Sequence, residues 1–252
     1  RSLVGSEMCI RDSYGSNWIM IKAVFFDFDE TLQDRTAAFE RYMDGFFARF
    51  FPGVTGGELT EKKHQMRQSG NGGYVDRVEW YKGLIALWRW TDAPAAKALA
   101  EHYDRTFGDC CVIFPDAVPM LQALRKKGIV TGVITNGPSY LQNHKMDESG
   151  LRPYLDLVVV SGDVGVHKPD PALFLYACDK VQLPPADCMY VGDHPVNDIA
   201  GALSAGMQAV RMNWGWFKDQ DLRADVPVIE KVSDVLQLSL IHISEPTRLL
   251  SI

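Results

Sequence analysis

The stretch Ile19-Met-Ile-Lys-Ala-Val-Phe-Phe-Asp-Phe28, followed at once by Asp29-Glu30-Thr31, decides the fold. It is apolar at almost every position, which is typical of a parallel strand that is buried on both faces. Later runs of the same character lie at residues 129–135, 155–161, 188–191 and 208–212, and helix-like segments fall between them at residues 139–149, 171–181 and 197–205. This alternation predicts an α/β fold, with a Rossmann-like parallel sheet and helices on both of its faces.

The chain that follows the first strand is helical in pattern and shows no strand signal until about Cys111. Its first helix carries an apolar stripe at helical spacing, and Pro52-Gly53 ends it. The stripe consists of Phe39, Tyr42, Met43, Phe46, Phe47 and Phe50. A second helix is indicated around residues 81–88. A third is indicated around residues 95–107, entered through Asp92 as a cap with Pro94 in its first turn.

These patterns divide the chain into a core, an insert and two extensions. We predict a Rossmann-like core of residues 20–34 and 113–237, interrupted by a helical insert of residues 35–112. The sequences of the two ends fit one DNA element and its reverse complement, and they resemble translated sequencing adapters. Residues 1–19 and 238–252 are therefore expected to be non-native extensions that take no part in the fold.

Composition argues against several classes of protein. The chain has 26 Lys and Arg against 32 Asp and Glu, a net charge of −6, so it lacks the basic surface of a nucleic-acid-binding protein. No apolar stretch approaches the ~18 residues expected of a membrane span. Cys110, Cys111, Cys178 and Cys188 show no C-x-x-C spacing, which favours free thiols in a reducing cytoplasm over a zinc site.

Polar clusters follow four of the predicted strands. The first strand ends in Asp27-Phe28-Asp29-Glu30-Thr31 and the second in Thr135-Asn136-Gly137. The third is followed by Lys168-Pro169, and the fourth ends in Gly192-Asp193-His194-Pro195-Val196-Asn197-Asp198. Ligands of open parallel sheets bind at the carboxyl ends of the strands, so these clusters should converge on one edge.

This set of side chains suits phosphoryl transfer. The Asp27 carboxylate can attack phosphorus and form an aspartyl-phosphate. Because a phosphate dianion repels a carboxylate, the reaction needs a hard cation such as Mg²⁺, for which Asp27, Asp193 and a backbone carbonyl near Asp29 are candidate ligands. Asp29 is also the candidate general acid for the leaving alkoxide and then the general base for water.

Three further groups could hold the phosphate. Lys168 can bind a phosphate oxygen and stabilise the charge of the transition state. The hydroxyl of Thr135 and the amide or backbone N–H of Asn136 can donate to the same oxygens.

The four clusters together resemble the haloacid dehalogenase superfamily of hydrolases. The motifs are D-F-D-E-T at 27–31, I-T-N at 134–136, K-P at 168–169 and G-D-x-x-x-x-D at 192–198. The resemblance implies a Rossmann-like core with a helical cap inserted after the first strand. It also implies a role for each matching residue: nucleophile for Asp27, acid/base for Asp29, phosphate binding for Thr135 and Lys168, metal binding for Asp193, and support near the metal or Lys168 for Asp198.

The superfamily covers several chemistries. Dehalogenase members lack the second aspartate of the first motif, so Asp29 favours a phosphatase. A sugar-phosphate mutase of the same superfamily is the alternative enzyme, and a non-catalytic binding module that kept the fold is the alternative of another class. Phosphonatases use a cap lysine as a Schiff base, but Lys62, Lys63 and Lys82 are more simply solvated charges. The expected substrate is a small phosphorylated metabolite such as phosphoglycolate, a sugar phosphate or a nucleoside monophosphate. The sequence leaves the choice among these, and the oligomeric state, open.

Other residues have both a functional and a plainer interpretation. His194 either contacts the bound phosphate or cap, or shapes its loop. The aromatic cluster Trp214, Trp216 and Phe217 is expected to close the core or to take part in self-association. Several residues of the insert could contact substrate or could form a solvated helix face over a packed aromatic core: Arg35, Arg41, Arg77, Trp80, Tyr81 and Lys82.

Overall fold

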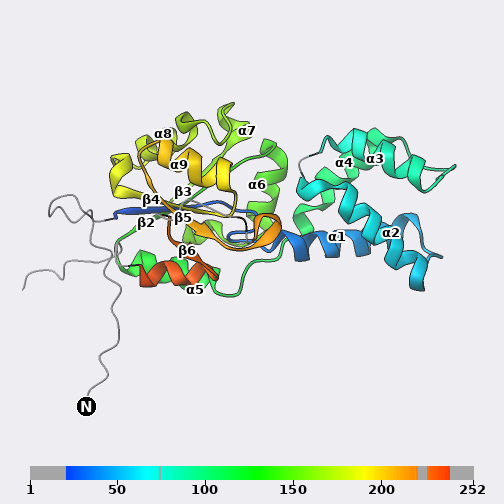
Figure 1. Ribbon diagram of the computed structural model, residues 1–252, viewed down its shortest axis with the longest axis horizontal. Coiled ribbons are helices and arrows are strands. Elements are labelled where there is room, and N and C mark those ends of the chain that lie inside the picture. The colour runs from blue at the N-terminus through cyan, green and yellow to red at the C-terminus, as the bar shows by residue number, and fades with distance from the viewer. Residues whose placement is uncertain (1–20, 74, 219, 221–225, 239–252) are drawn as a thin grey trace, which may run out of the picture.

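The computed structural model describes residues 21–73, 75–218, 220 and 226–238. Both expected extensions therefore lie outside the described residues, apart from position 238. The parallel sheet that the sequence predicts is confirmed, and within the described part of the chain it has six strands in the order β3-β2-β1-β4-β5-β6 (Figure 1). The strands are β1 Ala23–Phe26, β2 Val130–Thr135, β3 Leu157–Val160, β4 Cys188–Gly192, β5 Gln208–Met212 and β6 Val228–Ile229.

Helices cover both faces of this sheet. On one face lie α5 (Ala117–Lys126) and η7 (Val232–Gln237), and on the other lie α6 (Ser139–Glu148), α8 (Pro171–Lys180) and α9 (Gly201–Ser204) (Figure 1). The alternating side chains of β1 serve the two faces: Val24 and Phe26 join one apolar cluster, and Ala23 and Phe25 join the other. Burial on both sides explains why the strand has no polar side.

β1 lies at the centre of the sheet, between β2 and β4. Phe26 is in register with Val133 of β2 and Val191 of β4, so Asp27 follows directly at the aligned carboxyl ends. The strand order also reverses at β1, because the chain builds outward from it first on one side and then on the other. Such a reversal opens a crevice beyond the strand ends, which is where open α/β sheets bind ligands.

Four helices between β1 and β2 form a unit with its own apolar core, beside the sheet in Figure 1. The helix α1 begins after Asp34, whose Oδ1 accepts a hydrogen bond of 2.8 Å from the backbone N–H of Ala37. The expected aromatic stripe faces inward, and the hydroxyls of Tyr42 and Tyr81 lie 2.5 Å apart in this core. The helices are α1 Arg35–Phe50, α2 Gly56–Ser69, α3 Arg77–Leu87 and α4 Ala96–Thr106.

The insert is joined to the sheet by two chain segments that pair with each other. The N–H of Asp34 donates to Val112 O at 2.8 Å, and the N–H of Phe114 donates to Leu32 O at 3.0 Å. The return segment includes the short helix η2 (Gly108–Cys110). This pairing brings the insert back to its starting point and holds it over the carboxyl ends of the strands.

Some details differ from the prediction. The helix α4 begins at Ala96 after Ala95, with no side-chain cap, so the expected cap at Asp92 is wrong. The helix expected over residues 197–205 is a π-helical turn, Pro195–Ala200, followed by α9. The four cysteines outside the N-terminal extension are free thiols, as expected. None of the helices in the described residues has the length and apolar character that crossing a bilayer requires.

Candidate active site

Lys168 joins the ends of β1 and β4 in a buried ion network. Its Nζ donates to Asp27 Oδ1 at 2.8 Å, to Asp198 Oδ1 at 2.7 Å and to the Tyr190 hydroxyl at 2.8 Å. The Tyr190 hydroxyl in turn donates to Ile134 O at 2.8 Å, so β2 is tied in as well. Asp198 is fully buried, and Lys168 is 5 % exposed. The network holds Asp27 at the floor of the crevice with its carboxylate oriented.

Negative charge exceeds positive charge around this network. Burial raises the pKa of Asp27 to about 7. Lys168 lowers this pKa, but the repulsion from Asp198 offsets part of that effect. Burial, followed by the repulsion from Asp198 and Asp27, raises the pKa of Asp193 well above its usual range. Burial opposes the charge on Lys168, yet Asp198 and Asp27 raise its pKa above the ordinary value. One lysine therefore does not balance the three carboxylates.

The same carboxylates fit a divalent cation. Asp27, Asp193 and Asp198 are buried, and each offers an oxygen within 4.8 Å of the others. Asp198 is already committed, since Oδ1 accepts from Lys168 and Oδ2 accepts from the N–H of His194 at 2.9 Å. Asp27 and Asp193 therefore remain as the carboxylate ligands, and hard oxygen donors of this kind suit Mg²⁺.

The second strand places Thr135 and Asn136 beside the network. Thr135 is buried, and its hydroxyl accepts from Gln142 Nε2 at 2.6 Å. The side chain of Asn136 makes two bonds to the backbone of Lys168, donating to its carbonyl at 2.9 Å and accepting from its N–H at 2.9 Å. The amide of Asn136 thus holds the Lys168 segment in place. Its backbone N–H is the group that could meet a phosphate oxygen.

The carboxylate of Asp29 pairs with Lys145, whereas that of Asp27 pairs with Lys168. Both of its oxygens accept from Lys145 Nζ at 2.6 Å, and Oδ1 also accepts from Gln33 Nε2 at 2.8 Å. Burial by itself would raise the pKa of Asp29, but Lys145 and then Arg35 bring that pKa below its ordinary value. A contribution of Asp29 to a bound cation would therefore come from its backbone carbonyl, as the sequence suggests.

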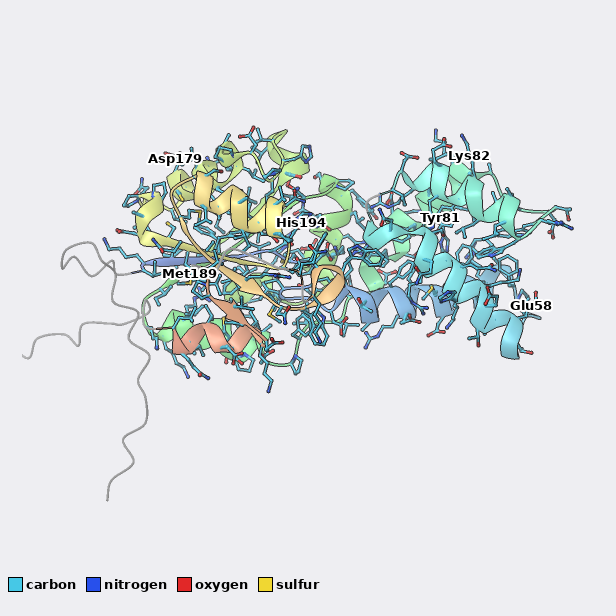
Figure 2. All side chains as sticks on the ribbon, viewed as in Figure 1. Glu58, Tyr81, Lys82, Asp179, Met189 and His194 are labelled. Carbon is cyan, nitrogen blue, oxygen red and sulfur yellow. The ribbon has the colours of Figure 1, made fainter. Side chains whose placement is uncertain are left out.

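His194 caps the turn that follows β4. Its Nδ1 accepts from the N–H groups of Val196 and Asn197, both at 3.1 Å, and its ring lies 4.2 Å from the ring of Phe217. Figure 2 shows His194 at the junction between the core and the insert. The loop-shaping role left open by the sequence is therefore present, and His194 also borders a cavity between the strand ends and the insert.

A cavity of about 820 Å³ lies between the strand ends and the insert. It takes in every predicted site residue together with Lys145 and Gln142. Of the six insert residues considered from the sequence, the described lining includes Arg35, Arg77 and Trp80. The others are engaged elsewhere: Arg41 donates to Cys111 O, Tyr81 is buried against Tyr42, and exposed Lys82 pairs with Glu79 on the outer side of the insert (Figure 2).

Aromatic residues after β5 also line this cavity, and the expected place against the core holds for Trp214. Trp214 packs edge-on against Phe114 with ring centroids 5.4 Å apart, but its neighbours Trp216 and Phe217 face the cavity. Trp216 is 51 % exposed and lies against Gly72 of the insert, where a Cβ would come within 3.2 Å of the indole. Apolar character alone did not distinguish a core residue from a cavity wall.

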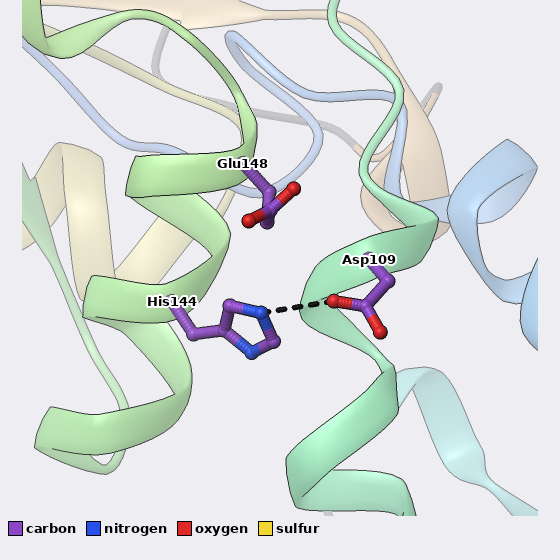
Figure 3. Close-up of side chains that lie close together, drawn as sticks. All are labelled: Asp109, His144 and Glu148. Atoms are coloured by element: carbon purple, nitrogen blue, oxygen red, sulfur yellow. Dashed lines mark ion pairs between the residues drawn. The ribbon is translucent and has the colours of Figure 1, made fainter.

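A second acidic group lies outside the cavity. Asp109, His144 and Glu148 come together where η2 meets α6 (Figure 3). His144 Nε2 and Asp109 Oδ1 are 2.9 Å apart, while both acidic residues are exposed. Exposed carboxylates of this kind are screened by water, so the pair is best understood as a tie between the return segment and the core.

Comparison with known proteins identifies the family of this chain. The haloacid dehalogenase-like hydrolase family matches residues 21–206. The chain is 30% identical over 210 residues to a glyceraldehyde 3-phosphate phosphatase of Methanopyrus kandleri, covering 82% of this chain and 90% of that protein. It is also 30% identical to the pyrimidine 5'-nucleotidase YjjG of Escherichia coli, over 75% of this chain and 85% of that protein.

A solved structure shows the same fold. The HAD-hydrolase YfnB of Bacillus subtilis, bound to magnesium, superposes with a TM-score of 0.71 at 22% identity, covering 89% of this chain and all of that one. The family match spans the strand ends that carry Asp27, Thr135, Lys168 and Asp193. The chain therefore belongs to the haloacid dehalogenase-like hydrolases, as a member of the phosphatase type.

Proposed function

We propose that the protein is a Mg²⁺-dependent phosphohydrolase that cleaves small phosphate monoesters through an aspartyl-phosphate on Asp27. One observation carries the proposal: Asp27 lies at the floor of the cavity, with Lys168 2.8 Å from its carboxylate and Asp193 close enough to share a cation. A nucleophile that is oriented by an ammonium beside a cation site is the arrangement that attack on a phosphate dianion needs.

In the first half-reaction, Asp27 attacks phosphorus and the bond to the ester oxygen breaks. Lys168 and the Thr135 hydroxyl stabilise the charge that gathers on the phosphoryl oxygens. A bound Mg²⁺, held by Asp27, Asp193 and the backbone carbonyl of Asp29, would neutralise the charge of the incoming phosphate. Asp29, in its protonated form, gives its proton to the leaving alkoxide.

In the second half-reaction, water replaces the carboxylate of Asp27. The water oxygen forms the new bond to phosphorus, its proton passes to Asp29, and the bond between Asp27 and phosphorus breaks. The products are inorganic phosphate and the restored Asp27 carboxylate. The insert over the strand ends limits the access of bulk water during the first half-reaction.

The cavity bears on the size of the substrate. A volume of about 820 Å³ lies within the ~300–1,000 Å³ range of sites that enclose drug-sized ligands, so there is room for more than a two-carbon ester. Arg35 and Arg77 are cationic groups of the insert in the lining, and Tyr103 and Phe107 add aromatic rings beside them. We infer that sugar phosphates and nucleoside monophosphates fill this space better than phosphoglycolate does.

Two other chemistries of the superfamily fit less well. A dehalogenase has no use for an acid/base carboxylate such as Asp29. A phosphonatase would need a cap lysine at the reacting carbon, but Lys62, Lys63 and Lys82 are absent from the described lining of the cavity. A mutase would retain the phosphoryl group on its product, and a binding module would release none, so free phosphate distinguishes both from a hydrolase.

The test is phosphate release from p-nitrophenyl phosphate and from a panel of phosphoglycolate, sugar phosphates and nucleoside monophosphates, each with and without Mg²⁺. We expect Mg²⁺-dependent release by the parent, none by Asp27→Asn, and parent-like release by the control Asp179→Asn. Asp179 is exposed on α8, on the side of the core away from the insert (Figure 2). Absence of release by the folded parent with metal present would contradict the proposal.

A further inference from the structure

Lys145 is a buried cation that has no role in the two half-reactions proposed above. It lies on α6, its side chain is 2 % exposed, and its ammonium contacts three acceptors. Two of these are the Asp29 oxygens, both at 2.6 Å, and the third is Gln142 Oε1 at 2.7 Å. An ammonium has three N–H donors, so all of them are used. Burying an ammonium is costly, which makes this a specific arrangement.

The carboxylate of Asp29 is held from several sides as a result. Gln33 donates to Oδ1 at 2.8 Å, and Gln142 lies 3.4 Å from Oδ2. Gln142 is itself fixed, because its Nε2 donates to the Thr135 hydroxyl at 2.6 Å and to Asn136 O at 2.9 Å. A single set of hydrogen bonds therefore links Lys145 and Asp29 to the groups proposed to hold the phosphate.

We propose that Lys145 is the positioning residue that holds the Asp29 carboxylate for the water-activating half of the reaction. The inference rests on the proposed function and deepens it. In the arrangement seen, both oxygens of Asp29 act as acceptors, which is the state that a base needs when it takes a proton from water. It is also the state that Asp29 reaches once it has given its proton to the leaving alkoxide.

The step that depends on Lys145 is the hydrolysis of the aspartyl-phosphate. Water supplies the oxygen that bonds to phosphorus, the released proton goes to Asp29, and the electron pair of the broken bond returns to Asp27. Misplacing a catalytic group by about 1 Å can cost roughly 10²-fold in rate. Loss of Lys145 should therefore slow this step, while formation of the aspartyl-phosphate from an activated ester should be little affected.

p-Nitrophenyl phosphate separates the two steps, because its leaving group departs with little help from an acid. We compare the parent with Lys145→Met by rapid mixing in the presence of Mg²⁺. The expected result is a burst of p-nitrophenolate followed by a slow steady phase. The rate constant for hydrolysis should fall by about ten- to 10²-fold. The values of kcat and KM should fall together, so that kcat/KM is retained.

The controls exclude a general effect of removing a lysine. Lys126→Met removes an exposed lysine at the end of α5 and should behave like the parent. Unfolded enzyme lowers the burst amplitude and the apparent kcat but leaves KM unchanged, so partial unfolding of Lys145→Met cannot imitate a joint fall of kcat and KM. Lys145→Gln keeps a donor but removes the charge, and should show the same split if the methionine variant does not fold.

The outcomes separate this inference from the proposed function. A parent that releases no nitrophenolate with Mg²⁺ present contradicts the proposed function itself. If the parent is active, two results overturn the positioning role: kcat/KM of the Lys145 variants falls as much as kcat, or their hydrolysis step is unchanged. Lys145 would then be a structural link between α6 and β1.

Discussion

The ammonium of Lys168 joins two carboxylates that reach the site from different strand ends. Asp198 has no exposed surface and Asp27 is 9 % exposed, so neither charge can be compensated well by water. Removing one partner of a buried ion pair typically destabilises a protein strongly, because a buried charge is left unpaired. Lys168, which is proposed to bind phosphate, therefore also stabilises the core.

Lys168→Met should therefore affect two measurements. We expect kcat with p-nitrophenyl phosphate to fall by roughly 10²–10³-fold, as when a single charge-stabilising donor is lost. We also expect the free energy of unfolding to fall by about 3–5 kcal/mol, measured by urea denaturation without metal. Lys126→Met is the matched control. Unchanged unfolding of the Lys168 variant would show that the network does not stabilise the fold.

The sequence predicts some site residues far better than others. Asp27, Thr135 and Asp193 end strands, and the carboxyl ends of parallel strands meet at one edge whatever the details of packing. Lys145 and Gln142 lie on a helix, where the direction of a side chain depends on how the helix is rotated against the sheet. Their spacing of three residues places them on one face, which was the available signal.

At the scale of elements, the turn η1 (Asn71–Gly73) brings the insert into contact with the core. Gly72 has a positive φ of 62° and lies against the indole of Trp216. A side chain at this position would meet both the strain of the left-handed region and the ring. Gly56, the first residue of α2, has a similar φ of 60° but open space around it. Comparing substitutions at these two glycines therefore separates the effect of backbone strain from the effect of contact with the core.

We expect Gly72→Ala and Gly56→Ala to lose similar stability, on the order of 1–2 kcal/mol, because both alanines would be left-handed. Only Gly72→Ala should lower kcat/KM, since it pushes the insert away from the site. Adding Trp216→Ala to Gly72→Ala should restore part of the loss. Equal kcat/KM for the two single variants would show that this contact does not govern access to the site.

The elements themselves follow the sequence where burial leaves a pattern. The strands β2 and β5 lie within a residue of their expected bounds, because their apolar runs are buried on both faces. The helix α2 was not predicted, because Met66 is its one buried residue and its sequence therefore carries no apolar stripe. β6 was also missed, since two residues, Val228–Ile229, are too few to show a period.

At the scale of the whole molecule, the buried excess of carboxylates should make stability depend on pH. Burial raises the pKa of Asp27 from 3.8 to about 7, that of Glu30 from 4.5 to about 7, and that of Asp193 well above its usual range. Groups of this kind bind more protons in the folded state than in the unfolded state. Their contribution is complete below their ordinary pKa values, and for Asp27 and Glu30 it is lost as the pH rises through about 7.

The metal-free protein should therefore be less stable at about pH 8 than at about pH 5. Asp27→Asn should reduce this difference, because it removes one of the raised groups. Mg²⁺ requires ionised ligands, so the rise in Tm that it causes should be larger at the higher pH. Thermal unfolding with EDTA or with Mg²⁺ at both pH values checks this. A metal effect independent of pH would argue against binding by these carboxylates.

The general architecture could be predicted because spacing fixes it: alternating apolar runs and helices give the sheet, and a long helical interval gives the insert. The cavity between them could not, because it depends on how the paired segments near Gln33 and Ile113 set the insert over the strand ends. The place of Trp216 and Phe217 in its wall follows from the same packing.

The most direct test of the central claim is to find the phosphoryl group on Asp27. The parent is mixed with Mg²⁺ and p-nitrophenyl phosphate, quenched in acid within the first turnover, digested and examined by mass spectrometry. We expect one phosphoryl group on the peptide that contains Asp27, lost on longer incubation and absent from Asp27→Asn. Phosphate release by the parent with no covalent phosphoryl group, or with the group on another residue, would contradict the account.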